Sequence, residues 1–146
     1  LLKLEITESV FITSMKYVVN VLNQLKKLGI CIALDDFGTG YSSLGYLQNL
    51  PIDTIKIDKS FIDSINFKTH DKQLVGSIIA LVHQMGFDVI AEGVENTEQL
   101  EYLRKQKCDC IQGYLWGKPL KESLLDGLIV QDSQPSLELS KNPETV

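Results

Sequence analysis

The stretch ICIALDDFGTG, residues 30–40, decides the fold class of this chain. Its first five residues are apolar without interruption, which is typical of a parallel strand buried on both faces. The run ends in the acids Asp35 and Asp36, and the glycines Gly38 and Gly40 then allow the backbone to turn. Taken alone, the two acids could end a strand and cap the next turn, or they could bind a ligand.

The same pattern repeats along the chain, because short apolar runs alternate with segments of helical periodicity. We expect strands at residues 3–7, 30–37, 54–57, 88–91 and 109–112. We expect helices from residue 13 or 14 to 28, from about 43 to Pro51, over 74–85, over 96–103 and at 121–127. Gly29 and Gly86 are expected to stop two helices, and Asn96 with Gln99 resembles a capping box. Strand–helix alternation predicts right-handed crossovers and a parallel sheet, hence an α/β fold.

Composition limits the number of domains and the classes of partner. Of the 146 residues, 44% are hydrophobic and 23% charged, which is ordinary for a globular domain. Residues 131–146 are polar and aperiodic, so we expect one domain over 1–130 and a disordered polar tail after it. The net charge of −5 argues against a nucleic-acid polymer as partner. It would also repel a small anionic substrate unless cations are bound.

The cysteines and histidines do not indicate a metal site. Cys31, Cys108 and Cys110 lack zinc-site spacing, and we expect reduced thiols. His70 and His83 have no second histidine at ligand spacing and are interpreted as surface or packing residues. With no apolar run near the roughly 20 residues of a membrane helix, we expect a cytoplasmic domain, although the parent protein could be membrane-anchored. The sequence opens within an apparent strand and lacks an initiator Met, so we expect it to be cut from a longer chain.

Acidic residues stand at the ends of four successive predicted strands. They are Glu5 and Glu8, Asp35 and Asp36, Asp58, and Glu92 and Glu95. In parallel α/β folds the carboxyl ends of the strands build the active site. Converging carboxylate oxygens suit Mg²⁺ or Mn²⁺ better than a soft metal. Together with Lys56, these acids form the set that metal-assisted phosphoester hydrolysis requires.

Each of these residues also has a simpler interpretation. Lys56 could face solvent, although a lysine inside a buried sheet needs a carboxylate or phosphate partner. Glu8 and Glu95 could be acids at helix starts, where the helix dipole favours them. Tyr114 and Trp116 are interpreted as wall or core residues rather than platforms for a stacked base.

Taken together, these segments resemble the EAL family of cyclic di-GMP phosphodiesterases. The resemblance lies in LEITES at 4–9, DDFGTGYSSL at 35–44, IKID at 55–58 with SF at 60–61, AEGVE at 91–95, and QGY at 112–114 with KP at 118–119. The segments follow the family's order and spacing from Leu4 to Pro119. The ten-residue segment 35–44 is the most specific of them.

The resemblance implies a (β/α)₈ TIM-like barrel, of which about five strands are present and the N-terminal strands are missing. It implies two divalent cations, Mg²⁺ or Mn²⁺, per intact site. Glu5, Asp35 and Asp36 would bind metal, with Asp35 bridging both ions. Lys56 would hold or polarise the attacking water, and Glu92 would be the general base.

Three further roles follow from the resemblance. Asp58 would lie near the second metal and the water, Gln112 would support the site by hydrogen bonding, and Glu8 would anchor the loop over 37–43. The implied reaction opens one phosphodiester of cyclic di-GMP to give linear pGpG. The implied partners are cyclic di-GMP, a second copy in a homodimer, and an upstream sensor or cyclase domain.

One departure from the family concerns the metal ligands. The family's Glu-Ala-Leu stretch and the Asn of the following strand lie upstream of the segment matching 4–9, and neither occurs in these 146 residues. We therefore expect the chain alone to bind metal poorly and to hydrolyse little. The alternatives are a catalytically degenerate EAL domain acting as a cyclic di-GMP receptor in signalling, and a barrel acting on another phosphorylated metabolite.

Overall fold

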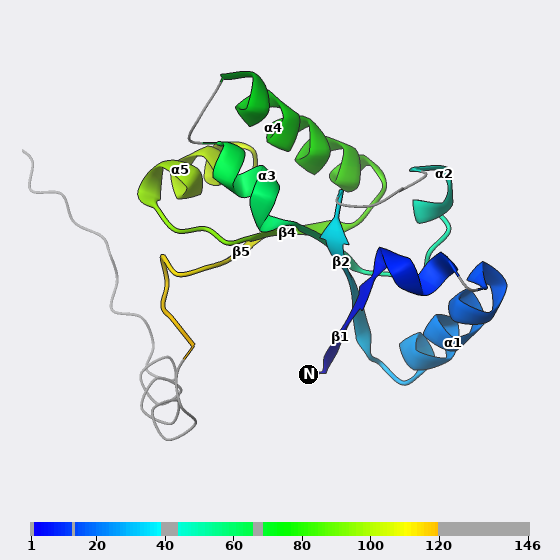
Figure 1. The fold of residues 1–146 in the computed structure, drawn as a ribbon. Helices are drawn as coiled ribbons and strands as arrows, with labels where there is room; N and C mark the ends of the chain where they lie inside the picture. Colours follow the sequence, from blue (N-terminus) through cyan, green and yellow to red (C-terminus); the bar gives the residue numbers. More distant parts are fainter. Residues whose placement is uncertain (1, 13, 39–43, 66–68, 120–146) are drawn as a thin grey trace, which may run out of the picture.

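A single parallel sheet of five strands forms the framework of the molecule (Figure 1). The computed structural model describes residues 2–12, 14–38, 44–65 and 69–119. The strands are β1 (Lys3–Thr7), β2 (Cys31–Phe37), β3 (Thr54–Ile57), β4 (Asp88–Glu92) and β5 (Cys110–Gln112). They pair in chain order, so β1 and β5 lie at the two edges. The predicted α/β class and parallel sheet are confirmed.

Helices connect the strands and lie along the outer side of the curved sheet (Figure 1). They are the 3₁₀ helix η1 (Glu8–Ile12), α1 (Met15–Lys27), α2 (Leu44–Leu47), α3 (Lys59–Ser64), α4 (Thr69–Gln84) and α5 (Thr97–Lys105). Sequence periodicity did not indicate η1 and α3, because helices of five and six residues are too short to show a period. The predicted helix at 121–127 and the predicted tail at 131–146 lie outside the described residues.

Local signals in the sequence explain where the longer helices begin and end. Asn96 accepts a hydrogen bond from the Gln99 N–H and the Gln99 side chain bonds back, which confirms the capping box of α5. Gly29 and Gly86 have φ values of 79° and 84°, the left-handed conformation that ends a helix at low cost for glycine. Leu28, the predicted end of the first helix, is the C-cap of α1 and is 76% exposed, because the helix has ended there.

The two sides of the strands have different chemistry, since successive residues point to opposite sides. One side contributes to the hydrophobic core against the helices, through Ile32, Leu34, Ile55, Ile57, Val89 and Ala91. Helical residues such as Leu22, Val75 and Ile79 pack against them. The other side carries Lys56, between the core residues Ile55 and Ile57 of β3. The core therefore places a charged side chain on the inner side of the sheet.

Aspartates also stand at the amino ends of the strands, just before β3 and β5. Asp53 accepts hydrogen bonds from the Ile32 N–H of β2, at 2.8 Å, and from Lys26 of α1. Asp109 accepts a hydrogen bond from the Val89 N–H of β4, at 2.8 Å. We call Asp53 and Asp109 the amino-end aspartates. Each ties the strand that follows it to the neighbouring strand.

Asp109 has a second partner in His83 of α4, whose Nε2 lies 2.7 Å from Asp109 Oδ2. The interpretation of His83 as a surface or packing residue thus omitted a specific polar contact.

No helix within the described ranges is long and apolar enough to cross a membrane. Tyr114 and Trp116, expected in a wall or core, are 58% and 74% exposed, so neither is a core residue in the described part of the chain.

Candidate active site at the carboxyl ends of the strands

Lys56 is the centre of a group of acidic side chains from three other strands. Lys56 lies in β3 and is only 3% exposed. Its Nζ lies 2.8 Å from Glu5 Oε2 of β1, 3.0 Å from Asp35 Oδ1 of β2 and 2.7 Å from Glu92 Oε1 of β4. Four neighbouring strands thus contribute one residue each to a single ionic group. This placement supports the interpretation that Lys56 points inward and not to solvent.

Strand register explains why these side chains meet. β1 and β2 pair in parallel with Glu5 opposite Ala33 and Thr7 opposite Asp35, and Lys56 of β3 lies opposite Ile90 of β4. Glu92 follows two residues after Ile90, on the same side of β4 and further toward its carboxyl end. The long lysine side chain reaches along the strands to this level. The acids therefore gather around the Lys56 ammonium, at the carboxyl ends of the strands.

Asp35 and Asp36 are adjacent in a strand, yet both face the same region. Asp36 has φ of 54°, the left-handed region, and the pairing of β2 with β3 shifts register between Leu34 and Phe37. The irregularity turns the second aspartate toward the first, and the Asp36 N–H donates to Asp35 Oδ1 at 3.0 Å. The turn that the sequence placed at the following glycines thus begins at Asp36 itself.

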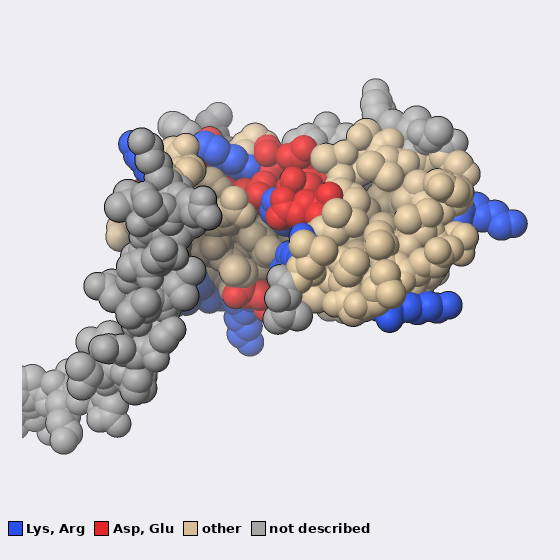
Figure 2. Space-filling view, turned by 90° about the horizontal axis from the view of Figure 1, so that it is seen from below, with Lys and Arg blue, Asp and Glu red and all other residues tan. Residues whose placement is uncertain are grey.

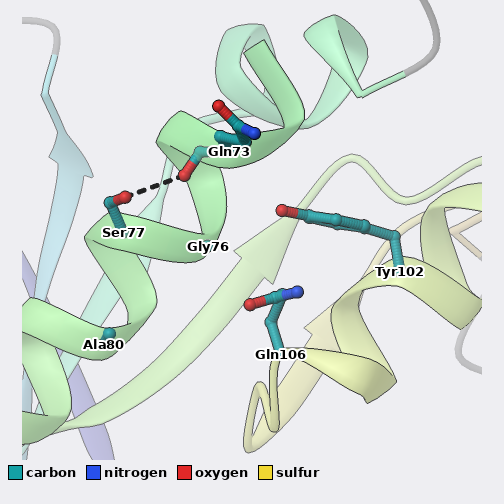
Figure 3. A pocket seen from close by; sticks show the side chains of 6 residues that line it. All are labelled: Gln73, Gly76, Ser77, Ala80, Tyr102 and Gln106. Atoms are coloured by element: carbon teal, nitrogen blue, oxygen red, sulfur yellow. Dashed lines mark hydrogen bonds between the residues drawn. The ribbon is translucent and has the colours of Figure 1, made fainter. Parts of the chain in front are cut away.

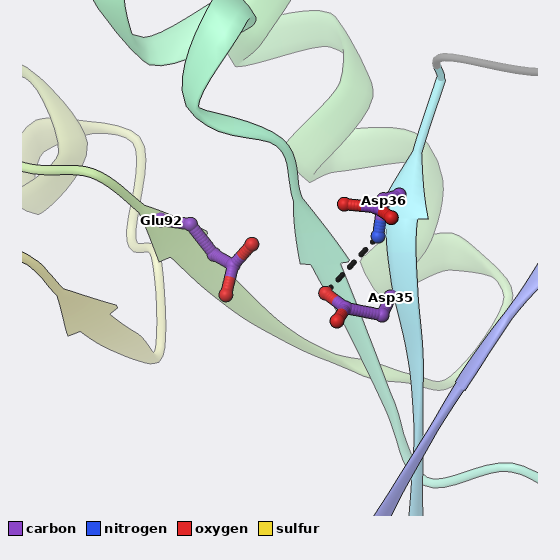
Figure 4. A group of neighbouring side chains, drawn as sticks. All are labelled: Asp35, Asp36 and Glu92. Atoms are coloured by element: carbon purple, nitrogen blue, oxygen red, sulfur yellow. Dashed lines mark hydrogen bonds between the residues drawn. The ribbon is translucent and has the colours of Figure 1, made fainter.

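Asp35, Asp36 and Glu92 form a set of acids suited to a cation (Figure 4). One carboxylate oxygen of each lies within 4.8 Å of the others. The two aspartates come from the end of β2 and point toward Glu92, which comes from the end of β4 (Figure 4). Their ligand atoms are all carboxylate oxygens, so the donor set fits Mg²⁺ or Mn²⁺. Figure 2 shows acidic side chains gathered in the middle of one face of the molecule.

Electrostatics differ between Lys56 and its partners. Burial alone would lower the pKa of Lys56, but hydrogen bonds to Glu5, Glu92 and Asp35 outweigh burial and raise it. Burial raises the pKa of Glu92, and the negative charges of Asp35 and Glu5 add to this, while Lys56 opposes it. Lys56 is therefore a permanent cation. Glu92 is a carboxyl group whose proton affinity is increased, as expected for a general base.

The remaining predicted site residues are Asp58, Gln112 and Glu8. Asp58 is the N-cap of α3, and its Oδ1 accepts hydrogen bonds from the hydroxyl and the N–H of Ser60. The Ser60 hydroxyl lowers the pKa of Asp58. Gln112 ends β5 opposite Glu92. Glu8 begins η1 directly after β1, but residues 39–43 of the loop it was expected to anchor lie outside the described residues.

Lys59 is a residue that the sequence did not single out. Its Nζ lies 2.6 Å from Asp63 Oδ1 and 3.1 Å from Glu95 Oε1, so it connects α3 to the segment after Glu92. Gly93 has φ of 69°, and a Cβ there would lie 2.3 Å from Lys59 Cγ. The spacing of Lys59 and Asp63 is visible in the sequence as an i,i+4 pair, whereas the contact with Glu95 is not.

A separate surface hollow of about 480 Å³ lies between α4 and α5 (Figure 3). Its lining residues are Gln73, Gly76, Ser77, Ala80, Tyr102 and Gln106. Tyr102 and Gln106 point from α5 toward α4, and Gly76 leaves room for them (Figure 3). None of the acids around Lys56 lines this hollow.

Comparison with known proteins agrees with the fold. The family model described as the EAL domain matches residues 1–119, and the chain belongs to this family. It is 42% identical over 125 residues to the cyclic di-GMP phosphodiesterase NbdA of Pseudomonas aeruginosa, covering 86% of this chain and 16% of NbdA. The expected partial TIM-like barrel is confirmed by the EAL neighbours and the five-stranded parallel sheet.

Two solved structures extend the comparison. The EAL domain of Mycobacterium smegmatis DcpA matches with a TM-score of 0.83 and 38% identity, covering 91% of this chain and 60% of that one. A manganese and cyclic di-GMP complex of Klebsiella pneumoniae BlrP1 matches with a TM-score of 0.72 and 33% identity, covering 80% and 29%. The chain spans between 15% and 19% of the length of the first curated relatives it matches.

Proposed function

We propose that this chain supplies the metal-binding and proton-transferring residues of a cyclic di-GMP phosphodiesterase that produces linear pGpG. The observation that carries the proposal is the position of Lys56 within 3.0 Å of carboxylates from three other strands. A phosphodiesterase relative and a manganese and cyclic di-GMP complex of a related protein support it. We further propose that the domain ends by residue 130.

The residues of this chain have distinct tasks in the proposed reaction. Asp35 and Asp36, with Glu5, would hold two Mg²⁺ or Mn²⁺ ions, which would supply positive charge to the phosphodiester and lower the pKa of a bound water. Glu92 accepts the proton of the attacking water, because its pKa is raised toward the working range. Lys56 fixes the orientation of Glu92 and offers hydrogen-bond donors to the water.

Three flanking residues support this arrangement. Asp58, the N-cap of α3 directly after β3, would lie near the second metal and the attacking water. Gln112, opposite Glu92 at the end of β5, holds the adjoining strand end by hydrogen bonding. Glu8 anchors the loop that follows β2. A homodimer through this loop and an upstream sensor or cyclase domain are further parts of the proposal.

Ligands from outside residues 1–146 complete the metal site in this proposal. The family's Glu-Ala-Leu stretch and its Asn are the expected additional ligands, and the 146 residues contain neither. The assay therefore uses the intact protein that contains these residues, with the 146-residue chain tested beside it. We expect the isolated chain to be nearly inactive.

A direct experiment measures conversion of labelled cyclic di-GMP to pGpG with Mg²⁺ or Mn²⁺ and with a chelator. We expect turnover only with metal. Asp35→Asn is expected to lower the rate at least about a hundredfold, the order of loss that follows removal of one charge-stabilising group. Asp63→Asn is the matched control, because Asp63 lies outside the group around Lys56 and its change alters the net charge equally.

The second candidate function is a receptor that binds cyclic di-GMP without cleaving it. Its distinguishing result is saturable binding of the dinucleotide with no pGpG at any metal concentration. That result would contradict the proposed hydrolysis. Retention of Glu5, Asp35, Lys56 and Glu92 in one ionic group favours the enzyme.

A further inference from the structure

Lys56 and a divalent cation would use the same oxygen-bearing side chains. Asp35 and Glu92 belong to the set of acids suited to a cation, and both are ion-paired with Lys56 at 3.0 and 2.7 Å. Asp35 Oδ1 also accepts the Asp36 N–H at 3.0 Å, so this oxygen already faces two donors. A cation that binds this oxygen has to displace one of the donors, and the ammonium is the one that can withdraw, because the N–H is fixed in the backbone.

Charge balance shows why the lysine occupies this position. Glu5, Asp35, Asp36 and Glu92 carry up to four negative charges and Lys56 one positive charge, which leaves −3. Carboxylates this close repel one another unless a cation lies between them. A lysine that is 3% exposed also needs partners for its ammonium. The acids therefore provide partners for the buried ammonium of Lys56, and the ammonium reduces the repulsion among the acids.

We propose that Lys56 is an internal counter-ion that competes with the divalent cation, so that metal loading is an exchange. Metal entry moves the ammonium off Asp35, and metal loss brings it back and keeps the acids together. The inference rests on the metal binding in the proposed function and adds a regulation of that site. Metal affinity is then set partly by how firmly Lys56 holds its acids.

The test is Mn²⁺ binding to the intact protein, measured by titration calorimetry. We expect Lys56→Met to bind Mn²⁺ at least about tenfold more tightly than the unmodified protein, since the competing cation is gone. Lys59→Met is the matched control. It removes the same charge from a lysine that is paired with Asp63 and Glu95, outside the cation-binding set.

We expect Lys59→Met to change the affinity by less than about twofold, because exposed charges are screened. Equal or weaker Mn²⁺ binding by Lys56→Met would overturn the exchange. An equal gain in both variants would also overturn it, because the effect would then be one of overall charge.

A second measurement does not depend on the folding of Lys56→Met. In the unmodified protein, the ¹⁵Nζ signal of Lys56 is followed by NMR as Mg²⁺ is added. We expect the signal to shift as Mg²⁺ saturates the site, and an unchanged signal at saturation contradicts the proposal. If Mn²⁺ binds and the Lys56 signal shifts but no pGpG forms, the proposed hydrolysis is rejected and the exchange stands. If pGpG forms but the Lys56 signal does not change at metal saturation, the exchange is rejected and the proposed hydrolysis stands.

Discussion

The two ends of the same sheet use aspartate and glutamate in opposite ways. At the amino end, Asp53 and Asp109 each accept hydrogen bonds from a backbone N–H of the neighbouring strand and from a side chain of the helix that precedes that strand. At the carboxyl end, Glu5, Asp35 and Glu92 converge on one lysine. The amino-end aspartates thus join elements of the fold, whereas the carboxyl-end acids crowd together at some cost. The partners of an acid, not its residue type, separate a structural from a chemical role.

The pKa shifts follow this division. At the amino end, burial would raise the pKa of Asp53, but hydrogen bonds from Lys26 and Ile32 outweigh it and lower the pKa. The pKa of Asp109 is lowered in the same way, by His83 and the Val89 N–H. At the carboxyl end, burial raises the pKa of Glu92. The fold therefore favours the ionised form of the two amino-end aspartates and disfavours the ionised form of Glu92.

The largest expected effect separates the two ends by activity. Glu92→Gln should lower turnover of cyclic di-GMP by about 10²–10⁴-fold, the usual contribution of a general base. The free energy of unfolding of this variant should not fall, because the fold disfavours the ionised form of Glu92. Steady-state kinetics and urea unfolding check both parts. Severe destabilisation with normal turnover per folded molecule would assign Glu92 to the structural group.

The next effect concerns stability at the amino end. Asp53→Ala and Asp109→Ala should each lower the free energy of unfolding by about 1–3 kcal/mol, because a buried backbone N–H loses its acceptor. Both N–H groups belong to residues with 0% exposure, Ile32 and Val89. Turnover at low temperature should stay near that of the unmodified protein. A stability unchanged by both substitutions would remove the joining role of these aspartates.

A smaller effect is expected at Gly93, beside the general base. Gly93→Ala should cost about 1–2 kcal/mol of stability, because φ of 69° is unfavourable for alanine and the new Cβ meets Lys59. Turnover should fall modestly, since Glu92 directly precedes this position. Lys59→Ala in the same chain removes Cγ and Cδ, which lie 2.3 and 2.6 Å from the new Cβ, but keeps Lys59 Cβ at 2.7 Å, so it should recover only part of the loss in thermal unfolding. The absence of any recovery would show that the contacts with Lys59 Cγ and Cδ do not cause the loss.

The smallest effect is a change in acid sensitivity. The folded-state pKa of Asp109 lies below its usual 3.8, so its ionised form stabilises the fold above that value. This stabilisation is lost as the pH falls through the lowered pKa. The stability difference between the unmodified protein and Asp109→Asn should therefore shrink between neutral pH and strongly acidic pH. Urea unfolding at several pH values measures it, and a constant difference would exclude the linkage.

Much of the fold is predictable because strand and helix signals are local. The predicted strands at 3–7 and 54–57 match β1 and β3, and the one at 30–37 differs from β2 by a single residue. The capping residues of α5 are also correctly predicted. Apolar runs and capping patterns reflect interactions within a few residues of one another. They are therefore visible without the tertiary structure.

The site is only partly predictable, for a physical reason. A lysine inside a buried strand requires acidic partners, so the partnership of Lys56 follows from its position. The left-handed conformation of Asp36 does not, because aspartate gives only a weak preference for it. Contacts such as Lys59 with Glu95 and His83 with Asp109 join residues far apart in the chain. They depend on how helices dock on the sheet, and no local spacing encodes them.

The left-handed conformation of Asp36 has a practical consequence for anyone designing an inactive reference protein. Most side chains pay about 1–2 kcal/mol to adopt it, whereas asparagine tolerates it nearly as well as aspartate. An alanine at position 36 would confound a lost ligand with a misshapen backbone. Asparagine removes the charge and leaves the local path of the chain alone, so the loss of function can be attributed to chemistry.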